Sequence, residues 1–175
     1  MQITTTKRLS IELVTLADSS FFFKLLNSPN WLEFIGDRGI KSEADAVNYI
    51  QKNIIDSYNI HGYGFYKLVS LESKIAIGMC GFKKRDYLEN ADIGYAILPK
   101  YEGQGYTSEA AKAIVDYGFN VLQLNPILAI TTAKNTASKN LLRKIGLKEI
   151  GIIKPNEVDV ELLLFSKANH LQCMK

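Results

Sequence analysis

The residues with the clearest chemical potential form a glycine-rich turn, Gly103-Gln104-Gly105, within the stretch "ILPKYEGQGYTSEAAKAIVDYGF" (residues 97–119). An apolar segment precedes the turn, and a helical pattern starts near Thr107. The first N–H groups of a helix have no partner within the helix, and glycines let a ligand approach the backbone closely. The helix dipole adds partial positive charge at the same place. The turn therefore predicts a site for an anion such as a pyrophosphate.

Two common phosphate-binding motifs do not match this turn. The dinucleotide fingerprint requires a third glycine where this chain has Ser108, and the Walker A loop requires a Gly-Lys-Ser/Thr sequence that the chain lacks. Gly-x-Gly between a strand and a helix is also frequent without any ligand. Taken alone, the turn leaves two interpretations open, an anion site or ordinary turn chemistry.

The elements that must position this turn form a mixed α/β pattern. A strand is predicted at residues 10–16, and two helices at about 18–26 and 42–58 are separated by an ordered loop. Three strands joined by short connections follow, at 62–70, 74–83 and 91–99, which favours antiparallel pairing. After the turn come a helix, a strand, a helix and two strands, at 107–122, 127–133, 136–146, 147–154 and 159–167. The pattern predicts seven strands and four helices in a largely antiparallel sheet.

Composition limits the function classes. A chain of 175 residues with 47% hydrophobic content is typical of one globular domain, and a net charge of +3 is too small to argue for nucleic acid. The basic run at residues 83–85 is interpreted as a solvated hairpin tip. The start of the chain does not have the layout of a signal peptide, and no apolar run approaches membrane-spanning length. We expect a soluble, cytoplasmic protein with no nucleic-acid or membrane partner.

Residues that bind metals or form disulfides are isolated from one another. Cys80 and Cys173 are far apart and lie in no Cys-x-x-Cys or Cys/His array. His61 and His170 are distant from each other and from acidic clusters. The sequence therefore suggests neither a disulfide framework nor a metal cofactor.

Two separated segments together resemble the Gcn5-related N-acetyltransferases (GNAT). Residues 92–110, "DIGYAILPKYEGQGYTSEA", resemble the acetyl-CoA-binding core, Gln/Arg-x-x-Gly-x-Gly/Ala, except that Lys100 replaces Gln or Arg. Residues 135–151, "NTASKNLLRKIGLKEIG", are similar to the second signature, Asn-x-x-Ser/Ala-x-x-Leu-x-x-Lys-x-Gly-Phe, with Leu147 in place of Phe. Residues 6–50 resemble the ribosomal-protein-alanine acetyltransferase (RimJ/RimL-like) branch. The resemblance implies a single domain at 1–168, a short tail at 169–175, and a sheet whose fourth and fifth strands splay apart.

The resemblance also implies acetyl-CoA as co-substrate. The backbone from Glu102 to Thr107 would hold the pyrophosphate of coenzyme A, and the strand end at Ile97 and Leu98 would pair with the pantetheine arm. Asn135 would hydrogen-bond pantetheine, and Ser138 would lie near the sulfur. The cofactor-binding residues so implied are Ile97, Leu98, Glu102, Gly103, Gln104, Gly105, Tyr106, Thr107, Asn135 and Ser138.

Direct attack by a primary amine on the thioester requires few protein groups. An alkyl amine is mostly protonated near neutral pH, so a carboxylate, or a water held by one, should accept its proton. Asp92 stands where the branch often carries Glu and is the expected base, with Glu89 in reserve. Many relatives use a tyrosine as general acid at the position of Leu142, so Ser138 or solvent would have to replace it here.

The acceptor is expected to be a protein N-terminus or a small-molecule amine. Its site should form from the first loop and the adjoining strand, at Trp31, Phe34, Asp37, Arg38 and Phe65. An acyl-CoA-binding module without turnover is the alternative, left open by Leu142. A monomer and a homodimer are both compatible with the sequence.

Overall fold

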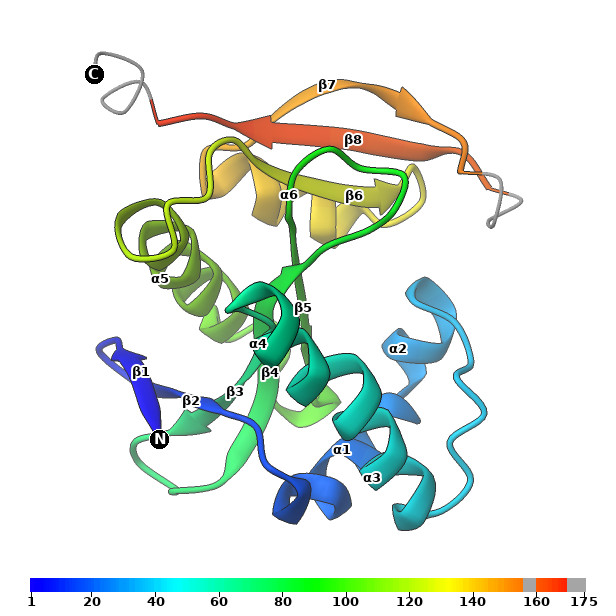
Figure 1. Ribbon diagram of the computed structural model, residues 1–175, viewed down its shortest axis with the longest axis vertical. Helices are drawn as coiled ribbons and strands as arrows, with labels where there is room; N and C mark the ends of the chain where they lie inside the picture. The colour runs from blue at the N-terminus through cyan, green and yellow to red at the C-terminus, as the bar shows by residue number, and fades with distance from the viewer. Residues whose placement is uncertain (156–159, 170–175) are drawn as a thin grey trace.

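The computed structural model describes residues 1–155 and 160–169 and consists of one mixed sheet with helices on both faces (Figure 1). The predicted tail, 169–175, lies outside the described residues except for Asn169. The described strands follow the order β1-β2-β3-β4-β5-β6-β8-β7. Their bounds are β1 Gln2–Thr5, β2 Leu9–Leu13, β3 Phe65–Ser70, β4 Ala76–Lys83, β5 Asp92–Ile97, β6 Ile127–Thr132, β7 Lys148–Ile153 and β8 Leu162–Lys167. All neighbouring pairs are antiparallel except β5 and β6, which confirms the predicted fold class.

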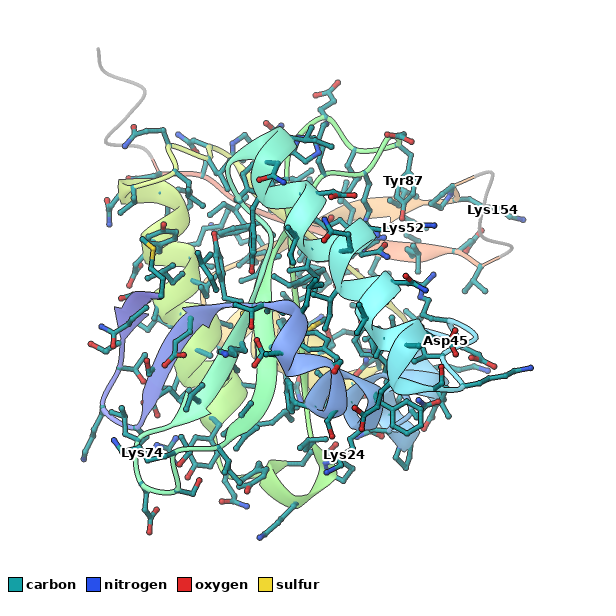
Figure 2. The ribbon with its side chains drawn as sticks, turned by 60° about the horizontal axis from the view of Figure 1, so that its bottom comes forward. Lys24, Asp45, Lys52, Lys74, Tyr87 and Lys154 are labelled. Carbon is teal, nitrogen blue, oxygen red and sulfur yellow. The ribbon has the colours of Figure 1, made fainter. Side chains whose placement is uncertain are left out.

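Six α-helices flank the sheet in the described part of the chain. They are α1 Ser19–Leu26, α2 Pro29–Phe34, α3 Glu43–Ile50, α4 Asp56–His61, α5 Tyr106–Asn120 and α6 Thr136–Lys144. A π-helical turn, Gln51–Ile55, joins α3 and α4 into one long helix that crosses a face of the sheet (Figure 2). Short 3-10 turns lie at Leu16–Asp18 and Pro99–Tyr101.

Alternating side chains of the strands build two apolar cores, one on each face of the sheet. Helix α5 and Leu142 of α6 contribute to one core, which includes Ile93 and is lined by Tyr95. Helices α1, α2 and α3 contribute to the other core, which includes Phe65 and Met79. Figure 1 shows α1, α2 and α3 on the opposite side of the view from α5. Each residue of β5 therefore faces one of two distinct helical layers.

The structure corrects the element count in two places. There are eight strands rather than seven, because Gln2–Thr5 pairs with β2 as an edge strand. The predicted loop between the first two helices contains α2, because Pro29 stands at its first turn, where a proline fits a helix, instead of breaking the segment. The predicted cap of the second helix is confirmed, since the Ser42 hydroxyl accepts a hydrogen bond from the Asp45 N–H.

Candidate active site

Strands β5 and β6 meet at one end and part beyond it. Their register holds the single pair Asp92 and Leu128, and the Leu128 N–H donates to the Ala91 carbonyl at 3.0 Å. On its other side β5 pairs with β4 up to Ile97. In Figure 1, β6, β7 and β8 lie at an angle to the rest of the sheet. The predicted splay of these strands is confirmed. Among the described residues, no strand pairs with this backbone edge of β5 beyond Asp92, as far as Ile97 and Leu98.

The glycine turn follows this open edge and begins α5. Gly103 and Gly105 have φ angles of +71° and +81°, and Gly105 is the N-cap residue of the helix. Such angles are strained for other residues, which explains the two glycines. The helical bonds begin where the Glu109 N–H donates to the Gly105 carbonyl, so the N–H groups of residues 106–108 have no partner within the helix. The residues predicted to hold a pyrophosphate thus lie together on one turn, exposed at 102–105, beside backbone N–H groups that have no partner within the helix.

Arg8, which the sequence did not single out, holds this turn from the N-terminal segment. Its Nη1 donates to the Gln104 carbonyl at 3.0 Å, and its Nε pairs with Glu109 at 2.7 Å. Its guanidinium also lies over the Tyr106 ring, 4.1 Å from the centroid. Glu109 further accepts hydrogen bonds from the Arg8 N–H and the Thr6 hydroxyl. These contacts fix the direction of the turn, although the partners are about a hundred positions apart in the chain.

Replacing Arg8 by alanine is expected to raise the KM for acetyl-CoA by about tenfold, because hydrogen bonds to charged groups contribute about 1.5–3 kcal/mol. The KM for the acceptor should change little. Steady-state kinetics with each substrate varied in turn makes the comparison. Lys7→Ala, which removes the neighbouring exposed charge, is the matched control. Equal KM values for acetyl-CoA in the two variants would show that Arg8 does not order the turn.

Helix α6 presents Ser138 toward β5. The Asn135 side chain caps α6 by accepting a hydrogen bond from the Ser138 N–H at 2.9 Å. The Ser138 hydroxyl lies 2.9 Å from the Tyr95 hydroxyl, so this contact connects α6 with β5. Burial raises the pKa of the Tyr95 phenol, and the Ser138 hydrogen bond works against that rise. Tyr95 therefore stays protonated near neutral pH and can donate a hydrogen bond.

The structure brings Asp92 to the closed end of the splay and pairs it with Arg85. The Arg85 Nε lies 2.9 Å from Asp92 Oδ1, and the carboxylate is only 1% exposed. Burial raises the pKa of Asp92, whereas the charge and hydrogen bond of Arg85 and the charge of Lys83 lower it. The interpretation of residues 83–85 as a solvated hairpin tip is wrong, because Lys83 is half-buried at the end of β4 and Arg85 is an ion-pair partner.

The other predicted proton-transfer positions lie elsewhere. Glu89 is exposed on the β4–β5 connection, where its carbonyl accepts a hydrogen bond from Lys84. Leu142, at the position of the family's tyrosine, is 1% exposed and packs in the core under α5. Neither residue is part of the Tyr95–Ser138 pair or the Arg85–Asp92 pair.

The predicted acceptor residues lie on the face covered by α1 to α4. Trp31 and Phe65 are buried in that core, and Phe34 is half-buried. Asp37 and Arg38 are exposed on the connection between α2 and α3, where Asp37 accepts a hydrogen bond from the Gly39 N–H and Arg38 donates to the Ile35 carbonyl. The Phe65 ring packs over Gly94 of β5, since a Cβ built at Gly94 would meet that ring at 3.0 Å.

Within residues 1–155 and 160–169, no group of three or more His, Cys, Asp or Glu side chains is arranged to hold a metal ion. In the same residues, no helix has the length and apolar content needed to cross a bilayer.

Solved structures that superpose on this chain include acetyltransferases. The ribosomal-protein-S5-alanine acetyltransferase from Vibrio fischeri superposes with a TM-score of 0.80 at 16% identity, covering 97% of both chains. The microcin C7 self-immunity acetyltransferase MccE, in complex with acetyl-CoA and AMP, gives a TM-score of 0.78 at 18% identity, covering 93% of each chain. The parted sheet with its glycine turn is thus an acetyltransferase-type fold.

Sequence comparison assigns the family directly. Residues 8–148 match the acetyltransferase (GNAT) domain. The chain is 30% identical over 150 residues to the uncharacterized N-acetyltransferase YnaD of Bacillus subtilis (strain 168), a match that covers 86% of this chain and 85% of the relative. The chain belongs to the GNAT acetyltransferase family and is an acyltransferase.

Proposed function

We propose that this acyltransferase transfers an acetyl group from acetyl-CoA to a primary amine, by direct attack while both substrates are bound. The supporting observation is that the glycine turn stands at the end of the open edge of β5. A pyrophosphate at the turn would continue into an extended arm along that edge, as an added strand does. MccE, which has a related fold, has been solved in complex with acetyl-CoA.

The residues around the glycine turn and the open edge of β5 fit such a co-substrate. The free N–H groups that follow Gly105 can hold a pyrophosphate, and the backbone of Ile97 and Leu98 can pair with pantetheine. Asn135 uses its oxygen to cap α6, which leaves its amide N–H groups for the arm. Bound acetyl-CoA would supply the thioester carbonyl that the amine attacks.

The two polar pairs face opposite sides of β5. Tyr95 lines the core under α5, whereas Asp92 has the strand parity of Ala96, which packs on the α1–α3 core. A thioester held at the parted edge would have a carboxylate on one face and a phenol on the other. We propose that the amine enters from the α1–α4 face and that the thiolate leaves toward Tyr95 and Ser138.

Each pair has a defined role in this proposal. Asp92 accepts the ammonium proton through a bridging water, because its carboxylate is almost fully buried. The phenol of Tyr95 is less acidic than a thiol, whose pKa is about 8.5, so Tyr95 stabilises the thiolate by hydrogen bonding rather than by full proton transfer. This phenol replaces the missing tyrosine at Leu142, which argues against a binding module without turnover.

Tyr95→Phe is expected to lower kcat by about tenfold with little change in the KM for acetyl-CoA, since one hydrogen bond to a developing anion is lost. Tyr117→Phe removes a hydroxyl from the same core and is the control. Single-turnover rates would show the loss directly. An unchanged kcat in Tyr95→Phe would exclude the phenol from thiolate stabilisation.

The proposed function is tested by incubating the protein with acetyl-CoA and a panel of peptides and small amines, and by detecting acetylated products by mass spectrometry. Acetyl transfer to any amine above the uncatalysed rate supports the proposal. Tight coenzyme A binding with only background thioester loss across the panel would favour the binding module.

A further inference from the structure

Lys83 and Arg85 flank Asp92 at the closed end of the splay, on the face from which the acceptor would enter. Lys83 and Asp92 are directly opposite each other in the β4–β5 register, so their side chains share that face. Asp92 is bonded to Arg85 instead. Within the described residues, Lys83 is half-buried and forms neither an ion pair nor a side-chain hydrogen bond, and Asp92 is the carboxylate whose charge acts on it. A half-buried lysine without a direct partner is available to an anion supplied from outside.

Arg85 also has unused donors. Its Nε binds Asp92 and its Nη1 donates to the Tyr87 hydroxyl at 3.2 Å, which leaves Nη2 without an acceptor among the described residues. Figure 2 shows Tyr87 on the side of the molecule that also carries Lys52 and Lys154. Arg85 can therefore keep Asp92 in place and still bind another anion.

A third cation, Arg38 on the connection between α2 and α3, acts electrostatically on Lys83. Burial lowers the pKa of Lys83, and the charges of Arg85 and Arg38 lower it further, while Asp92 is the one carboxylate that opposes them. Arg38 and Arg85 likewise act against the burial that raises the pKa of Tyr49. Among the described residues, two arginine charges and one carboxylate charge, that of Asp92, thus act on Lys83.

A neutral donor lies on the same face of the sheet, in the core under α1 to α3. The Trp31 indole N–H is buried without a hydrogen-bond partner in the described residues, and its ring packs edge-on against Tyr49 with centroids 6.4 Å apart. A buried donor without a partner is rare in a folded protein and calls for an explanation. This face of the sheet thus holds an unpaired neutral donor in addition to the cations.

We infer that the amine acceptor carries an acid group, a carboxylate or a phosphate, which binds Lys83, Arg38 and Arg85 beside Asp92. This inference rests on the proposed function, which supplies the amine and acetyl-CoA. The positive amine would lie toward Asp92 and the acid toward the three cations, so the charge pattern orients a zwitterion. The same pattern disfavours a polyamine, whose second cation would meet like charges.

The test uses four amines of nearly equal length: 4-aminobutyrate, 3-aminopropylphosphonate, 4-aminobutyramide and 1,4-diaminobutane. The groups in which the four compounds differ are three carbons away from the reacting amine or farther, so the pKa of that amine is similar in all four. The two acids are expected to exceed the amide in kcat/KM by at least about tenfold, and the diamine should be poorest. The ratio between the carboxylate and the phosphonate then shows which acid group the site prefers.

Lys83→Met and Arg38→Gln are expected to bring the acid-to-amide ratio toward one while acetyl-CoA affinity stays unchanged. Lys24→Met, on the exposed side of α1, is the matched control and should keep the ratio. Arg38 is exposed, so its variant tests the inference even where Lys83→Met impairs folding.

Two results would overturn the inference while leaving the proposed function intact: equal use of acid and amide, or a ratio that neither variant changes. Acetyl-CoA binding without acetylation of any amine would instead refute the proposed function, and the inference would fall with it.

Discussion

Replacing Gly103 by glutamate is expected to weaken acetyl-CoA binding by at least about 100-fold. The glycine has a φ of +71° on an exposed turn, and a Cβ built there would meet no atom within 4 Å. The new side chain would therefore occupy the space beside the helix N-terminus and bring a negative charge to a site that favours an anion. Losing two hydrogen bonds to a charged group accounts for this effect, at about 1.5–3 kcal/mol each.

A second glycine controls for the strain and charge of this substitution. Gly62 has a φ of +75°, is exposed and also has open space at its Cβ, but it lies at the C-cap of α4. Gly62→Glu should lose similar stability in thermal unfolding and retain acetyl-CoA affinity in calorimetry. If Gly103→Glu bound acetyl-CoA as tightly as Gly62→Glu, the turn would not be the pyrophosphate site.

The local signals in the sequence predicted the parts of the fold that depend on short-range chemistry. Positive φ angles strongly favour glycine, so Gly103 and Gly105 identified the turn before α5. The helix cap at Ser42 could be predicted for the same reason, since it needs only a neighbour three residues away. The edge strand β1 was missed because Gln2–Thr5 is mostly polar and is held by pairing with β2, not by its own apolar pattern.

The polar pairs of the site could not be predicted in this way. Tyr95 and Ser138 are 43 positions apart and meet only because α6 packs beside the parted strands. Arg8 reaches the glycine turn across 96 positions. Lys83 and Arg85 have the charge pattern of a solvated tip, and only the register of β4 with β5 shows that they flank Asp92. Tertiary contacts, which have no fixed sequence spacing, therefore decided the site's electrostatics.

Asp92→Asn is expected to lower kcat by at least about 100-fold with little change in acetyl-CoA affinity, because general bases typically contribute 10²–10⁴-fold. The asparagine oxygen can still accept the hydrogen bond from Arg85, so the contact between residues 85 and 92 is kept. Asp116→Asn, on the exposed face of α5, is the control. Thermal unfolding of the Asp92 variant checks that the arginine left without its counter-charge does not unfold the site.

The pH dependence tests the same role independently. Burial raises the pKa of Asp92, so the wild-type rate should fall on the acid side at a pH above that of an ordinary aspartate. Because Arg85 lowers this pKa, Arg85→Gln should raise it further and move the acid limb to higher pH. In Asp92→Asn the acid limb of kcat should disappear. Either of two results would assign proton removal to another group: an acid limb that persists in Asp92→Asn, or an acid limb that does not move in Arg85→Gln. In both cases, protonation of the Asp92 carboxylate would not be what stops the reaction.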